Sequence, residues 1–299
     1  MSLVSLVRIR KNTNESIKSG ILKSLNLIEY SFPEDISNIV IKPNLCYYWD
    51  YSTGQTTDPR FIAGLIKIIR EKSPHADISI VESDASAMKC RHAFVMLGYE
   101  KLAKNCGVRL VNLSADICKK TKVVAGGESF EIMVPQTIQN ADVKINVPKI
   151  KYAREKIELT CALKNIFGCN PYPSKFRYHP RLGEAIVAMN KAMKFDLHLI
   201  DGNIVSGMRP QRLGLLMASR DPVAIDFAAA QIAGINPSRI RYFQLAAREG
   251  LGNKSYLQRG VPINCFKAVY PRKDIKKKLM DKAYLVAMRV GLGKRLGAQ

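Results

Sequence analysis

The chain has 299 residues, of which 47% are hydrophobic, and it carries a formal net charge of +22. This composition supplies a sizeable core, which argues against a disordered chain, and no run approaches the roughly 18–20 consecutive apolar residues of a membrane-spanning helix. The seven cysteines are scattered and include no Cys-x-x-Cys pair, which argues against a disulfide framework and against a zinc or iron–sulfur site encoded in local sequence.

The first segment, Met1–Lys11, alternates apolar and polar residues and lacks the apolar centre of a signal peptide, so we expect a cytoplasmic protein. Runs rich in Val, Ile and Leu predict strands, and apolar residues three or four positions apart predict helices. The expected strands are Leu3–Ile9, Ile39–Ile41, Ile78–Glu82, Val108–Leu113, Val143–Val147, Leu197–Ile200 and Leu213–Ala218, and the expected helices are Glu15–Glu29, Pro59–Lys72 and His92–Asn105. This alternation predicts an α/β fold, a mostly parallel sheet with helices on both faces.

The middle of the chain departs from this pattern. Thr121–Pro135 reads as two short strands joined at Gly126-Gly127, an inserted hairpin added to the sheet. A helical pattern resumes at Thr160 and is broken by Gly168 and by Pro171–Pro173. We expect residues 1–270 to form one α/β body, although the length also permits two lobes that share a cleft.

Positive charge is concentrated in two stretches. Lys144–Arg181 contains nine cationic and two acidic residues, a net charge of +7, and residues 271–299 contribute another +7. Within that tail, Asp274–Val290 predicts a basic amphipathic C-terminal helix, which could pack on the body or bind an anionic membrane surface or nucleic acid.

Polar residues follow four of the predicted strands, where ligands bind in open α/β sheets. Amines and amides from these positions could together hold a phosphate or carboxylate, although each lysine alone could equally be a solvated surface residue. The candidate substrate-binding residues are Lys42, Asn44, Lys149, Lys151 and Asn165, with Lys164 as a polarising, catalytic residue.

His179 lies inside the basic stretch, where neighbouring cations should lower its pKa and keep the imidazole neutral for acid–base work. A hydrogen-bonded structural histidine is the equally weighted alternative, and structural roles are preferred for the other three histidines. Glu82, Asp84 and Asp201 are the candidate ligands of a divalent metal, or they pair with lysines and cap helices instead. Asp221-Pro222 predicts a helix N-cap.

Six stretches resemble the domain-of-unknown-function family numbered 362, a bacterial and archaeal family. They are Ile41–Leu45, Thr57–Pro59, Val147–Lys151, Leu163–Gly168 followed by His179, Leu199–Gly202 and Ser219–Asp226. The resemblance implies an α/β fold and, in some longer relatives, an attached ferredoxin-like module. Two stretches depart from the family pattern: Tyr152-Ala153-Arg154 stands where a His is common, and Met208-Arg209-Pro210 where a Gly-Pro turn is usual.

These observations favour a cytoplasmic enzyme acting on a small phosphorylated or carboxylated substrate. Because the chain has no iron–sulfur motif, a redox version of this function requires an external ferredoxin-like electron carrier. The alternative is a protein that binds nucleic acid or an anionic membrane surface through its basic stretches. Nucleic acid is the less favoured partner, because few aromatic residues separate the lysines.

Overall fold

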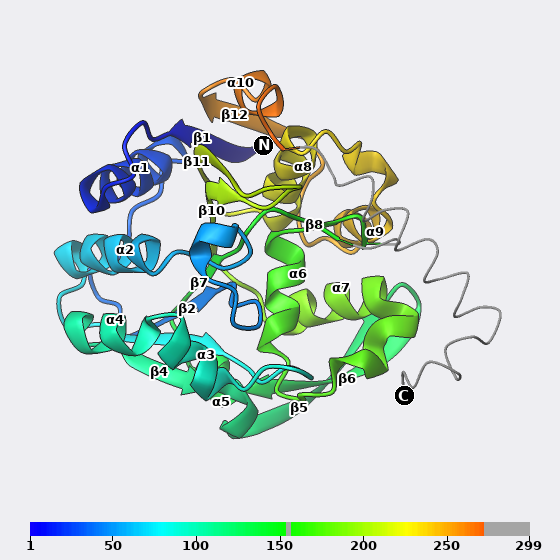
Figure 1. The fold of residues 1–299 in the computed structure, drawn as a ribbon. Helices are drawn as coiled ribbons and strands as arrows, with labels where there is room; N and C mark the ends of the chain where they lie inside the picture. Colours follow the sequence, from blue (N-terminus) through cyan, green and yellow to red (C-terminus); the bar gives the residue numbers. More distant parts are fainter. Residues whose placement is uncertain (154–156, 272–299) are drawn as a thin grey trace, which may run out of the picture.

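The seven predicted strands and one that was not predicted form an eight-stranded sheet in the computed structural model, which describes residues 1–153 and 157–271 (Figure 1). The sheet contains β12 (Tyr256–Gly260), β1 (Ser2–Arg8), β11 (Gln211–Ser219), β10 (Leu197–Val205), β7 (Val143–Val147), β2 (Asn38–Pro43), β3 (Asp77–Glu82) and β4 (Arg109–Asn112), in that spatial order. Neighbouring strands pair in parallel except at β11, which is antiparallel to both β1 and β10. The prediction of a mostly parallel sheet is confirmed.

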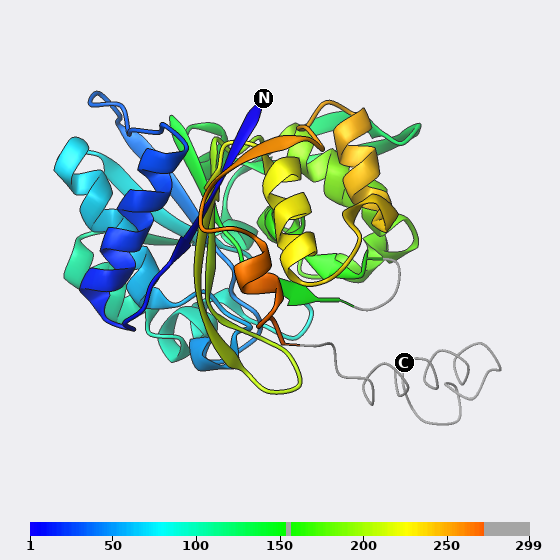
Figure 2. The same cartoon turned by 90° about the horizontal axis from the view of Figure 1, so that it is seen from above.

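Successive side chains of each strand point to opposite faces of the sheet, so each strand contributes to two apolar cores. In β1, Val4 and Leu6 belong to one core and Val7 to the other, and in β2 Val40 and Ile41 divide in the same way. Helices on both faces bury these residues (Figure 2). One face carries α1 (Asn14–Leu27), α2 (Pro59–Lys72), α3 (Cys90–Met96) and α4 (Tyr99–Cys106), and the other carries α6 (Ala162–Ile166), α7 (Leu182–Ala192), α8 (Pro222–Ile232) and α9 (Arg241–Arg248).

The helix N-termini follow from local sequence. Asp58 accepts a hydrogen bond from the backbone N–H of Arg60, and Pro59 occupies the first position of α2. The Asp221 carboxylate accepts from the backbone N–H groups of Val223 and Ala224, both at 2.9 Å, as the Asp-Pro pair predicts. These caps fix the start of α2 and α8 relative to the sheet.

Two predicted elements differ in detail. His92–Asn105 was expected as one helix but forms α3 and α4, because Gly98 adopts a left-handed conformation with φ of 78° that interrupts the helical hydrogen bonds. The hairpin exists as β5 (Cys118–Ala125) and β6 (Glu128–Pro135), but it forms its own two-stranded sheet against α7 instead of extending the central sheet.

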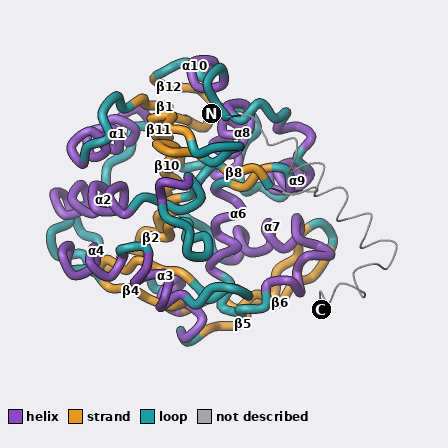
Figure 3. Tube along the Cα trace, in the orientation of Figure 1, coloured by secondary structure: helices purple, strands orange, loops and turns teal. Residues whose placement is uncertain are grey.

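Several short elements carried no clear sequence signal. They are α5 (Gln136–Gln139), α10 (Asn264–Lys267), the edge strand β12 and the two-residue strands β8 (Lys151–Tyr152) and β9 (Leu159–Thr160). The long loop that follows β2 lies beside α6 (Figure 3). The predicted C-terminal helix falls outside the described residues. In the part of the chain that is described, no helix combines the length and apolarity needed to cross a bilayer.

Candidate functional site

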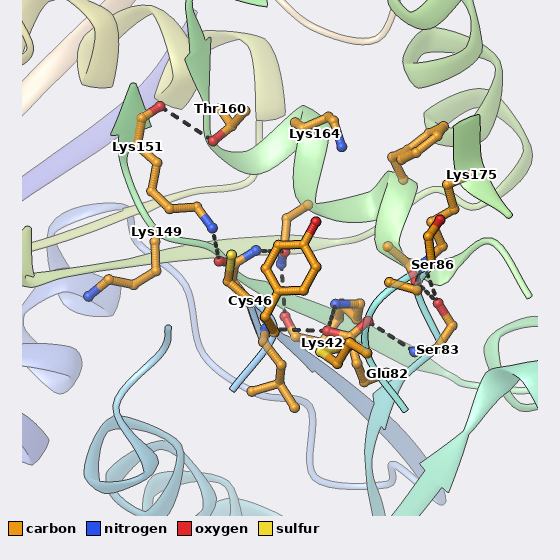
Figure 4. Close-up of a pocket in the computed structure, with 18 of the residues that line it drawn as sticks. Lys42, Cys46, Glu82, Ser83, Ser86, Lys149, Lys151, Thr160, Lys164 and Lys175 are labelled. Atoms are coloured by element: carbon orange, nitrogen blue, oxygen red, sulfur yellow. Dashed lines mark hydrogen bonds and ion pairs between the residues drawn. The ribbon is translucent and has the colours of Figure 1, made fainter. Parts of the chain in front are cut away.

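A cavity of about 290 Å³ opens beyond the carboxyl ends of β2, β3 and β7 (Figure 4). Five lysines of the described residues line it: Lys42, Lys149, Lys151, Lys164 and Lys175. Asn44, Glu82, Asn165 and His179 also lie in its wall. The structure therefore brings together amines from separate elements at the sheet edge, the location expected of a ligand site in an open α/β sheet.

Two of the five lysines are neutralised by buried carboxylates. Lys42 Nζ lies 2.7 Å from Glu82 Oε2, and Lys149 Nζ lies 3.0 Å from Asp201 Oδ2, with all four side chains at most 4% exposed. Lys149 also donates to the backbone carbonyl of Ile204 at 2.8 Å, and in Figure 4 its amine points away from the other lysines. These two pairs tie neighbouring strands together, and their charges are already balanced.

The other three lysines are half-buried and have no carboxylate within ion-pair distance among the described residues. Lys151 Nζ donates to Asn44 Oδ1 at 2.6 Å and to the Gln55 carbonyl at 3.1 Å. Lys175 Nζ donates to Ser83 Oγ at 2.7 Å. Lys164 Nζ sits 4.3 Å from the centre of the Phe167 ring. Among the described residues, these three amines thus form no ion pair with a carboxylate, although Glu82 lies near enough to favour the charged form of Lys175.

Burial and the repulsion between neighbouring positive charges lower the pKa values of these amines. Burial, together with the charges of Lys175 and Lys151, lowers the pKa of Lys164 to about 7. Burial lowers the pKa of Lys175 to about 8, and it also lowers the pKa of Lys151. An anion in the cavity would favour the charged form of each amine, so anion binding and proton uptake are coupled at this site.

A chain of side-chain amides fixes the position of Lys151. Asn44 Nδ2 donates to Asn165 Oδ1 at 2.8 Å, and Asn165 Nδ2 donates to Asn146 Oδ1 at 2.7 Å. Asn146 Nδ2 in turn lies 3.1 Å from Nδ1 of the buried His198. With Lys151 donating to Asn44, the hydrogen bonds run from the cavity into the sheet. Asn44 thus holds Lys151, and Asn165 holds Asn44, while their predicted role in orienting a ligand stays a prediction.

The short helix α6 carries both Lys164 and Asn165, and its N-terminus is held by a carboxyl group from α8. Asp226 Oδ1 accepts from the Ala162 backbone N–H at 2.6 Å, and its Oδ2 accepts from the Leu163 N–H at 3.1 Å. Burial raises the pKa of Asp226 to about 7. Although Asp226 is remote in sequence from this helix, it positions Lys164 through two backbone hydrogen bonds.

His179 lies exposed at the rim of the cavity, where its ring contacts that of Phe176 at a centroid distance of 4.7 Å. Partial burial and the nearby Lys164 lower its pKa. The imidazole is therefore mainly neutral at pH 7, in the form that accepts a proton.

The three candidate metal ligands are not gathered at one point. Glu82 and Asp201 belong to the two lysine pairs, and Asp201 lies within β10 instead of after it. Asp84 accepts from the Cys90 backbone N–H at 2.8 Å and pairs with Lys89 at 3.3 Å. The described residues contain no group of three His, Cys, Asp or Glu arranged to bind a metal ion, so the metal role stays a prediction without a ligand set there.

Lys175 was not predicted as a site residue, and Ser83 was considered only within the strand-end run Glu82-Ser83-Asp84, without a role of its own. Lys175 belongs to the basic stretch and precedes His179 by four positions, which was a usable signal for a shared site. Ser83 follows the strand residue Glu82 directly, and its hydroxyl donates to the Gly168 carbonyl.

A search of curated proteins finds the Thylakoid-associated protein sll1697 of Synechocystis sp., 27% identical over 236 residues, which span 74% of this chain and 70% of that protein. Among solved structures, the lactate racemase apoprotein from Thermoanaerobacterium thermosaccharolyticum aligns with a TM-score of 0.45 and 13% identity. That alignment covers 79% of this chain and spans 58% of the racemase chain.

The family model described as "Domain of unknown function (DUF362)" matches residues 39–231, which include every residue of the cavity wall named above. This match covers more than half of the sequence and contains the six resembling stretches. The chain therefore belongs to the DUF362 family.

Proposed function

We propose that this protein is an enzyme that binds a small organic anion, phosphorylated or carboxylated, in the lysine-lined cavity. The observation that carries the proposal is the set of three half-buried amines, Lys151, Lys164 and Lys175, without carboxylate partners among the described residues. Keeping uncompensated charge away from water costs free energy, and an anionic ligand recovers that cost.

The roles of the residues follow from their partners. Lys151 and Lys175 are held by neutral acceptors and keep N–H groups for an anion, which makes them binding residues. Lys164 polarises the substrate, and His179 at the rim exchanges a proton with it. Lys42 and Lys149 form ion pairs with Glu82 and Asp201, so in this proposal they support the site without contacting substrate.

A thermal-shift experiment with inorganic phosphate and a panel of mono- and dicarboxylates tests this function. A ligand present at one hundred times its Kd stabilises the folded protein by about 2.7 kcal/mol. The stabilisation should disappear in Lys151→Met and Lys175→Met and persist in Lys89→Met, whose side chain is 67% exposed. Equal responses from all four proteins would place the anion elsewhere.

A second candidate function is attachment to an anionic membrane surface. It is favoured by the tail from residue 271, with its net charge of +7, and by the thylakoid association named for the Synechocystis relative. Sedimentation with anionic phospholipid vesicles tests it, because binding through the tail should fall with rising salt and be lost on truncation after Pro271.

Binding to duplex DNA would instead weaken by about 0.9 log units per phosphate contact for each log unit of salt. Exchange with a ferredoxin-like carrier stays a prediction from the resemblance alone.

A further inference from the structure

Lys164 differs from the other four lysines of the cavity in what its amine contacts. Lys42, Lys149, Lys151 and Lys175 each donate hydrogen bonds to oxygen acceptors. Lys164 Nζ instead lies over the Phe167 ring, and no acceptor within hydrogen-bond distance is found for it among the described residues. Figure 4 shows the same contrast, with dashed lines at Lys151 and none at Lys164. Its amine is therefore not held in place by hydrogen bonds to the described residues and can approach a ligand in the cavity.

The surroundings of Lys164 favour the neutral amine. Burial, followed by the charges of Lys175 and Lys151 beside it, lowers the pKa of Lys164 to about 7, so a substantial fraction of the molecules carries a nucleophilic amine at pH 7. An ordinary lysine, with a pKa near 10.4, would be almost fully protonated at that pH. The two neighbours can remain charged while they hold an anion, which separates binding from nucleophilic attack.

The space around Lys164 suits a substrate larger than its anionic group. A second cavity of about 780 Å³ shares Thr160, Lys164, Phe176 and His179 with the first. A molecule anchored by its carboxylate in the first cavity can therefore extend past the Lys164 amine into the second. His179 lies in the wall common to both.

We infer that Lys164 is a nucleophile that forms a Schiff base with an oxo acid, a carbonyl compound whose carboxylate is held by Lys151 and Lys175. The amine attacks the carbonyl carbon to give a carbinolamine, and loss of one water leaves a carbon–nitrogen double bond. The carbonyl oxygen and the two amine protons leave in that water, with His179 positioned to relay a proton to the departing hydroxyl. No oxidant or reductant is consumed. The inference rests on the proposed function and names its substrate class.

Borohydride trapping tests it on the full chain. The protein is incubated separately with glyoxylate, pyruvate, oxaloacetate and 2-oxoglutarate, reduced with sodium borohydride, and analysed by intact mass and peptide mapping. We expect one reduced adduct, located at Lys164. Lys164→Arg, which keeps the charge but not the nucleophile, should lose the adduct, and Lys89→Arg should retain it. The rate of trapping should rise through a midpoint near pH 7, well below that of surface lysines.

Calorimetry of the same oxo acids and of inorganic phosphate, without borohydride, tests anion binding separately from the nucleophilic role of Lys164. If an anion binds but no adduct forms at Lys164, or the adduct forms at Lys151 or Lys175, then Lys164 is not the nucleophile, while the proposed anion site is retained. Absence of binding by every anion overturns both. Circular dichroism of Lys164→Arg establishes that the variant is folded, so a lost adduct reports on the amine.

Discussion

The side-chain amide of Asn44 donates a hydrogen bond to the side-chain oxygen of Asn165 at 2.8 Å, across 121 positions of the chain. This contact joins the loop after β2 to α6 and so connects the amine of Lys151 to the helix that carries Lys164. Because the Asn165 side chain both donates and accepts hydrogen bonds inside the protein, a change at this residue should disturb both lysines at once.

Substitution of Asn165 by Asp tests that connection. The Asn165 Nδ2 group faces Asn146 Oδ1 at 2.7 Å and the Lys42 carbonyl at 3.2 Å, so an added oxygen would face acceptors and carry a buried charge. We expect a loss of about 3 kcal/mol of unfolding free energy and weaker anion binding. Urea denaturation measures the first effect. Asn105→Asp, on the exposed side of α4, is the matched control and should change stability by less than about 0.5 kcal/mol.

Most of the sheet could be predicted because its strands carry continuous apolar runs. Val143–Val147 and Pro59–Lys72 have the bounds expected from sequence. The edge strand Tyr256–Gly260 could not be predicted, since it contains Gln258 and Arg259 and is largely solvent-exposed. Strands are recognised in a single sequence by the apolar residues that they bury. An edge strand pairs on one side only and buries few side chains, so its sequence lacks that pattern.

The location of the candidate site could be predicted from the sequence, but the ion pairs and hydrogen bonds between its residues could not. Strand-end position selected Lys42, Lys149 and Lys151, and all three line the cavity, while their role in binding a substrate stays a prediction. Nothing in the spacing distinguishes Lys149, which is paired with Asp201, from Lys151, which is not. That distinction depends on how the chain turns after β7, and therefore on tertiary contacts, as does the hydrogen bonding of Asp226 to α6.

The buried pair of Lys42 and Glu82 should be costly to break from one side. Lys42→Met leaves the Glu82 carboxylate buried, and among the described residues its remaining hydrogen-bond donors are the backbone N–H groups of Leu45 and Ser83. We expect a loss of about 3–5 kcal/mol in unfolding free energy, measured by urea denaturation. Combining Lys42→Met with Glu82→Gln should recover much of that loss, because the unpaired charge is removed.

The exposed pair of Lys120 and Glu131 provides the comparison. Its side chains are 60% and 66% exposed, so Lys120→Met should cost at most about 1 kcal/mol. A Lys42→Met protein as stable as Lys120→Met would mean that Glu82 is solvated or protonated in solution, contrary to the contacts described above.

Anion affinity should depend on pH through the amines with lowered pKa values. The pKa of Lys164 is lowered to about 7 and that of Lys175 to about 8; Lys175 in its charged form holds the anion, and the nearby charge of protonated Lys164 adds to the attraction. Affinity should therefore be constant below about pH 7 and fall above it, by up to about tenfold per pH unit for each deprotonated amine. Calorimetry at pH 8 in buffers of different ionisation enthalpy should detect proton uptake on binding. Lys164→Arg, whose charge does not titrate, should retain only the decline that begins near pH 8.

Asp226→Ala tests whether anion binding depends on the position of α6 as well as on the stability of the fold. The substitution leaves the backbone N–H groups of Ala162 and Leu163 buried without their acceptor, which costs about 2–4 kcal/mol and releases the first turn of the helix that bears Lys164. Anion affinity of the folded protein should fall as well, since the amine is no longer held at the cavity wall. Asp221→Ala removes a comparable buried cap, at the N-terminus of α8, and should lower stability while leaving anion affinity intact. If both variants lost affinity equally, general loosening of the protein rather than the placement of Lys164 would be the cause, and the positioning role of Asp226 would be wrong.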